Sequence, residues 1–113
     1  MSMLLKTRRL DDVVILDLSG RITMGEGTVM LRDTLQKLLA EGDRKFLVNL
    51  EAVDYIDSSG LGVLVSLSKK IREQGGELRL ANLNDDLKTL FELTKLDTLF
   101  QIADSRERAL DSF

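Results

Sequence analysis

The chain has 113 residues, 43% hydrophobic and 31% charged, so we expect residues 1–113 to form a single domain. Its net charge of −3, with acids and bases interspersed, supplies no basic surface for nucleic acid. Histidine and cysteine are both absent, which excludes catalytic triads, thiolate nucleophiles and ordinary structural zinc sites.

The composition also bears on location. The lack of cysteine fits a reducing compartment, and no N-terminal pattern typical of a signal peptide is present. The longest apolar run, residues 61–67, is far too short to span a bilayer. We therefore expect a cytoplasmic protein that is not inserted into a membrane.

Apolar residues alternate between strand and helix spacing along the first half of the chain. Residues 3–10 and 13–19 predict two antiparallel strands joined by a tight turn at Asp11 and Asp12. Residues 26–40 predict a helix, because leucines recur there at helical spacing. Residues 45–50 are almost continuously apolar, which predicts a strand covered on both faces at the centre of a parallel sheet.

The second half continues the alternation. It predicts a helix, a strand, a helix, a strand and a final helical segment at residues 58–74, 77–81, 85–94, 100–103 and 106–113. Right-handed crossovers then give an α/β fold: a mostly parallel, mixed five-stranded sheet with four or five helices and the first strand antiparallel at the edge. Partners of such sheets meet the loops after the strands, which we place at residues 20–27 and 51–60.

The segment Asp57-Ser58-Ser59-Gly60-Leu61-Gly62 lies where the second of these loops enters a helix. One interpretation is an ordinary N-cap, since Asp and Ser are preferred capping residues and glycine permits close packing. The other is a phosphorylation site, because a phosphate at a helix N-terminus faces unpaired N–H groups and the positive end of the helix dipole.

The chain resembles the bacterial anti-sigma factor antagonists, which are small STAS domains, over nearly its whole length. The strongest match is Val48-Asn49-Leu50 with Val53 and residues 55–62, and residues 16–22, 75–82 and 90–96 support it. The resemblance implies a STAS-like fold and a protein that is not an enzyme and holds no cofactor or metal. It also implies that Ser58 accepts phosphate, with Ser59 as the second choice.

The resemblance further implies partner switching that regulates transcription. The unphosphorylated domain binds an anti-sigma factor that is a serine kinase and so frees a sigma factor. Phosphorylation releases the kinase, and a PP2C-type phosphatase resets the switch. A phosphate adds about −1.5 to −2 charge beside Asp54 and Asp57, which would repel a surface fitted to a neutral serine. We expect a monomer or weak dimer.

The expected partner surface surrounds the phosphoacceptor. It comprises Thr23, Glu26, Asp54, Asp57, Ser59, Gly60, Leu61, Val63 and Leu67. Val63 and Leu67, with Gly60, would form a small apolar strip on the helix, unless another helix covers them. Asp54 and Asp57 have the alternative interpretation of solvated loop acids.

One position departs from the family pattern. The family often has an acid at the place of Thr23 that helps the switch, and Glu26 is the residue that could compensate. The alternative function is a non-phosphorylated STAS subunit of a lipid-transport ABC system or a sensory complex. An enzyme or small-molecule carrier is disfavoured, because the sequence has neither a phosphate-binding loop nor a dinucleotide fingerprint.

Overall fold

The structure is a computed structural model that describes residues 3–111 and 113. The elements follow in the order β1 (Leu4–Leu10), β2 (Val13–Ile22), α1 (Glu26–Ala40), β3 (Lys45–Ile56), α2 (Ser58–Glu73), β4 (Glu77–Ala81), α3 (Asp85–Leu93), the 3-10 turn η1 (Leu96–Thr98), β5 (Gln101–Ala103) and α4 (Arg106–Asp111). Within these residues the five strands form one sheet in the order β1-β2-β3-β4-β5. β1 is antiparallel to β2 and the other neighbours are parallel, which confirms the predicted fold class.

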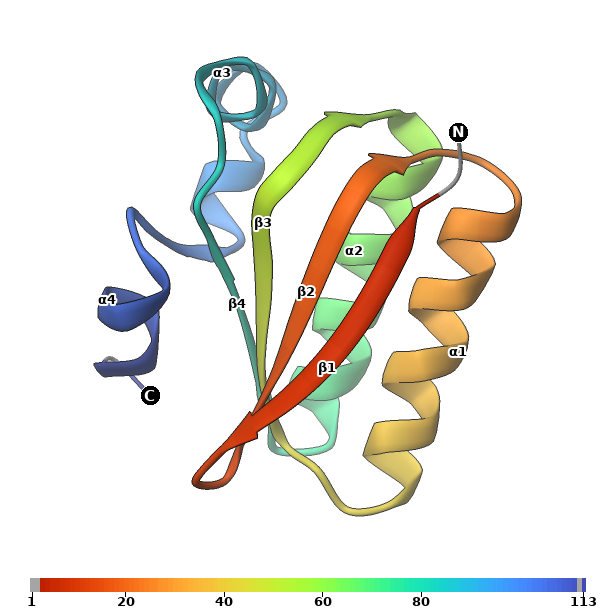
Figure 1. Cartoon of the computed structure of the whole chain (residues 1–113), viewed down its shortest axis with the longest axis vertical. Helices are drawn as coiled ribbons and strands as arrows, with labels where there is room; N and C mark the ends of the chain where they lie inside the picture. Colours follow the sequence, from red (N-terminus) through yellow and green to blue (C-terminus); the bar gives the residue numbers. More distant parts are fainter. Residues whose placement is uncertain (1–2, 112) are drawn as a thin grey trace.

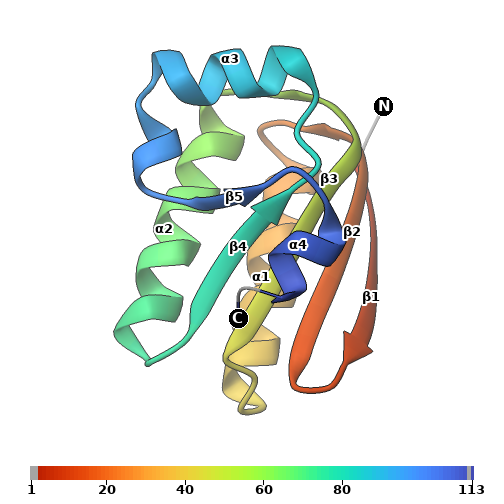
Figure 2. The ribbon, with the colours of Figure 1, turned by 90° about the vertical axis from the view of Figure 1, so that its left-hand side faces the viewer.

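The helices cover the two faces of the sheet unequally. α1 and α2 lie side by side against one face (Figure 1), and the short α4 packs on the other (Figure 2). β2 alternates between the two layers: Leu16 is fully buried beneath α1 and α2, whereas Ile15 belongs to a smaller cluster with Ala109 of α4. β3 likewise contributes to both clusters, which confirms its prediction as a central strand covered on both faces.

The two strands that lead to the candidate site are longer than predicted. β2 continues to Ile22 rather than residue 19, and β3 continues to Ile56 rather than Leu50, so much of the two predicted loops is strand. Two register shifts each insert one additional residue into β3 opposite β2. Inward side chains beyond Leu50 therefore recur every third residue, at Val53 and Ile56, and the two-residue alternation typical of a strand is lost.

The remaining boundaries agree with the sequence closely. α1 begins and ends as predicted, and α2, α3 and β5 differ by one residue at one end. The final predicted helix, residues 106–113, is helical to Asp111; its residue 112 lies outside the described residues. Phe113 packs against the cluster beneath α4.

Candidate functional site

The candidate site forms where β3 enters α2. The register pairs Ile22 with Ile56, so β2 and β3 end side by side. Asp57 follows Ile56 directly, and its backbone N–H donates to the Ile22 carbonyl at 3.1 Å. The turn at residues 23–25, which leads from β2 into α1, is thereby brought next to the first turn of α2.

The Asp57 side chain holds these two segments together. One carboxylate oxygen accepts a hydrogen bond from the Gly60 N–H at 2.8 Å, which caps α2, and the other accepts from the Met24 N–H at 3.0 Å. The backbone N–H groups of Gly60 and Met24 hold the pKa of Asp57 below its ordinary value. The alternative of a merely solvated loop acid is therefore wrong for Asp57, and the capping interpretation is confirmed.

Gly60 and Gly62, the two glycines of the motif, have different surroundings. A Cβ on Gly60 would lie 2.5 Å from the Ile22 carbonyl oxygen and 2.8 Å from Cγ2 of Ile56, so no side chain fits there. A Cβ on Gly62 would meet no atom within 4 Å, and Gly62 is exposed. Gly60 therefore permits the close approach of α2 to the ends of β2 and β3, whereas Gly62 is part of the surface.

Ser58 is exposed, and the residue that caps α2 is Asp57 rather than Ser58. Ser58 is the first residue of α2 and is exposed, and Ser59 beside it is half-buried. The first turn of α2 contains no acidic residue, so the positive end of the helix dipole faces Ser58 with only the Asp57 carboxylate beside it. The two interpretations of this motif are thus compatible: one residue caps the helix, and the next presents a hydroxyl to solvent.

The other predicted partner residues divide into exposed and buried groups. Glu26 is exposed at the start of α1, Thr23 is half-buried in the turn before it, and Asp54 is exposed as the additional residue of the second bulge. Gly60 and Leu61 are buried, so they shape this end of the molecule from beneath. Thr23 and Glu26 come from the segment that the Met24–Asp57 hydrogen bond fixes against α2.

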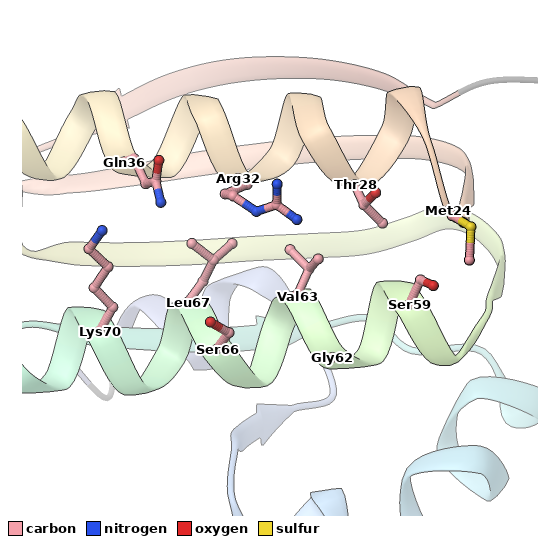
Figure 3. Close-up of a pocket in the computed structure, with 10 residues that line it drawn as sticks. All are labelled: Met24, Thr28, Arg32, Gln36, Ser59, Gly62, Val63, Ser66, Leu67 and Lys70. Carbon is pink, nitrogen blue, oxygen red and sulfur yellow. The ribbon is translucent and has the colours of Figure 1, made fainter.

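The predicted apolar strip on α2 is not exposed. Val63 and Leu67 are 8% and 2% exposed, because α1 lies against α2; the alternative stated with the prediction, that another helix covers them, is the one observed. They form the floor of a groove of about 410 Å³ between the two helices (Figure 3). Figure 3 shows the groove extending from Ser59 along both helices to Lys70.

Several groove residues are missing from the sequence prediction. α1 contributes Thr28, Arg32 and Gln36 to the wall opposite α2, and Met24 is 77% exposed near Ser59. The signal in the sequence is the four-residue spacing of the three α1 side chains, which places them on one helix face. That spacing identifies a face but does not show that the face lines a groove.

Among residues 3–111 and 113, no cluster of three or more His, Cys, Asp or Glu side chains is arranged to bind a metal ion. In the same residues, no helix has the length and apolar character needed to cross a bilayer.

Comparison with known proteins identifies the family. The family model of the STAS domain matches residues 5–109. The anti-sigma-B factor antagonist of Bacillus subtilis is 36% identical over 91 residues, covering 80% of this chain and 82% of that protein. The chain belongs to the STAS domain, anti-sigma factor antagonist family. Proteins of this family are regulators rather than enzymes, as the sequence predicts.

Solved structures agree with this assignment. The crystal structure of tm1081 from Thermotoga maritima superposes with a TM-score of 0.89 at 29% identity, over 96% of this chain and 92% of that one. Bacillus SpoIIAA shares the fold in its unphosphorylated form, with a TM-score of 0.76 at 18% identity over 96% of each chain. Its phosphorylated form gives 0.74 at 19% identity, over 96% and 98%. The fold is thus common to both forms of that protein.

Proposed function

We propose that residues 1–113 are one STAS domain that antagonises an anti-sigma factor and is switched by phosphorylation of Ser58. In its unphosphorylated form the domain binds an anti-sigma factor that is a serine kinase, so that a sigma factor is free. Phosphorylation of Ser58 releases this kinase, and a PP2C-type phosphatase restores the hydroxyl. The observation that carries the proposal is the exposed residue Ser58 at the N-terminus of a helix that Asp57 already caps.

The chemistry requires no catalytic group from this chain. The Ser58 oxygen bonds to the γ-phosphorus of ATP, the bond from that phosphorus to the oxygen bridging to ADP breaks, and the hydroxyl proton passes to a base of the kinase. An exposed serine at the first position of a helix is geometrically suited to enter a kinase active site. Because the core beneath it does not depend on the hydroxyl, the modification changes the surface and leaves the fold intact.

The effect on binding follows from charge. A phosphate adds about −1.5 to −2 charge next to the ionised Asp57 and near the exposed Asp54. The N–H of Gly60 is already occupied by Asp57, so the phosphate cannot be neutralised by that donor. Because Ser58 is exposed, the added charge also faces solvent and a docking partner, where it repels acidic groups and must be desolvated.

Thr23 supports a second candidate, a STAS subunit that is never phosphorylated. Its side chain carries no charge at a position where the family often has an acid, and the nearest acid along the turn is Glu26 at the start of α1. In this candidate the same end of the molecule binds a partner of a transport or sensory assembly constitutively.

Phosphorylation by the anti-sigma factor kinase of the same genome separates the two candidates. We expect ATP and this kinase to place one phosphate on Ser58, located by mass spectrometry of the full chain and its peptides. Ser59→Ala is the matched control and should accept phosphate like the wild type, whereas Ser58→Ala should accept none. A kinase that binds the protein yet leaves Ser58 unmodified would favour the constitutive subunit.

A further inference from the structure

The groove between α1 and α2 is lined by basic side chains, whereas its mouth, the end near Ser59, is surrounded by acidic ones. The groove runs between α1 and α2 from Ser59 to Lys70, which is about 17 Å at 1.5 Å per helical residue. Its lining includes the basic side chains of Arg32 and Lys70 and no acidic side chain. The mouth, in contrast, carries Asp57 and Glu26, with Asp54 at the end of β3 nearby.

The two cations of the groove are available to a ligand. Arg32 on α1 and Lys70 on α2 are both exposed, and within the described residues neither forms an ion pair. Figure 3 shows both side chains in the space between the helices, with Val63 and Leu67 beneath. A ligand lying here would meet positive charge from both walls and, at the end near Ser59, the exposed Met24 side chain.

From this geometry we propose that the groove binds an acidic, amphipathic segment of the anti-sigma factor. Carboxylates of the segment pair with Arg32 and Lys70, and its apolar side chains contact the exposed Met24 and the edge of Val63 that remains accessible. The length of the groove suits a polypeptide segment better than a compact anion, and the exposed, flexible Met24 provides adaptable apolar contact where the segment enters. This proposal rests on the proposed function, because the segment belongs to the same partner.

The groove and the phosphate on Ser58 would act on the same docked segment. An acidic segment lying in the groove passes Ser59, which follows Ser58 in the first turn of α2. The basic groove attracts the segment, and the phosphate beside Asp57 repels it, so the same charge that favours docking makes release sensitive to phosphorylation. Free protein and phosphoprotein would then differ in affinity without any change of fold.

Charge reversal inside and outside the groove provides the test. We expect Lys70→Glu and Arg32→Glu each to weaken binding of the anti-sigma factor kinase by about tenfold, measured by calorimetry with the unphosphorylated full chain. The matched controls are Lys69→Glu on α2 and Lys37→Glu on α1, which make the same charge change at exposed positions that do not line the groove. These controls should bind within about twofold of the wild type. Equal weakening by Lys69→Glu and Lys70→Glu would overturn the proposal.

The absence of cysteine allows a direct identification of the segment. Ser66→Cys introduces a unique thiol in the groove, and a photoactivatable maleimide attached to it should cross-link to an acidic, apolar-containing peptide of the kinase. A cross-link confined to a basic or purely polar peptide would contradict the proposal. Binding of inorganic phosphate, or self-association, that is lost in Lys70→Glu while kinase affinity is unchanged would assign the groove to an anion or to a second copy.

Failure of the groove and failure of the proposed function give different results. If Ser58→Asp weakens kinase binding but the groove variants do not, the switch stands and the groove proposal fails. If the wild-type protein binds no anti-sigma factor kinase, both proposals fail.

Discussion

The two ends of the α1–α2 surface are built from different kinds of contact. At the mouth, the contacts involve backbone atoms. The Asp57 carboxylate accepts hydrogen bonds from two backbone N–H groups, and the Ile22 carbonyl leaves no space for a Cβ on Gly60. Along the groove, Arg32, Ser66 and Lys70 are exposed side chains. Substitution of Asp57 or Gly60 should therefore affect folding first, and substitution of the groove side chains should affect binding alone.

The pair Gly60 and Gly62 gives the largest expected difference. Gly60→Ala forces a Cβ against the Ile22 carbonyl, and we expect it to lower the free energy of unfolding by about 2–3 kcal/mol. Gly62→Ala has space for its methyl group and should raise the free energy of unfolding by about 0.5–1 kcal/mol, because alanine is the better helix former. Urea unfolding of both variants measures the difference, and equal stabilities would show that the close approach at Gly60 is not required.

The acids Asp57 and Asp54 allow a second comparison between a residue with backbone contacts and an exposed one. Asp57→Ala removes the cap of α2 and the acceptor for Met24, so we expect the thermal unfolding midpoint to fall by about 5 °C. Asp54→Ala removes an exposed acid of β3 and should change the midpoint by less than about 2 °C. Calorimetry of the two variants compares them directly. A similar loss in both would mean that Asp57 acts only through its charge.

The fold could be predicted largely from apolar periodicity, but the site only in part. The helical spacing of Leu31, Leu35, Leu38 and Leu39 marks the core face of α1 without any tertiary information; three of them are buried and Leu38 is partly buried. The end of β3 could not be predicted, because its bulges replace two-residue alternation with a three-residue spacing. The groove could not be predicted either, since it exists only through the packing of α1 on α2.

Low pH should weaken the hydrogen bonds at the mouth by protonating the Asp57 carboxylate. Its folded-state pKa lies below its ordinary value of about 3.9, so the stability that it contributes is present above that value and is lost as pH falls through the lowered folded pKa. Asp57→Asn keeps an oxygen acceptor without this titration. Its stability should therefore fall less steeply than that of the wild type below about pH 4, as measured by urea unfolding across pH. Parallel curves would contradict the assignment of the titration to Asp57.

The central claim is that negative charge on Ser58 changes binding and leaves the fold unchanged. Calorimetric titration of the anti-sigma factor kinase with wild type, Ser58→Ala and Ser58→Asp, alongside their unfolding midpoints, tests this claim most directly. We expect all three to unfold at the same temperature within about 2 °C, Ser58→Ala to bind like the wild type, and Ser58→Asp to bind at least about tenfold more weakly. A Ser58→Asp variant that binds the kinase as tightly as the wild type would contradict the account.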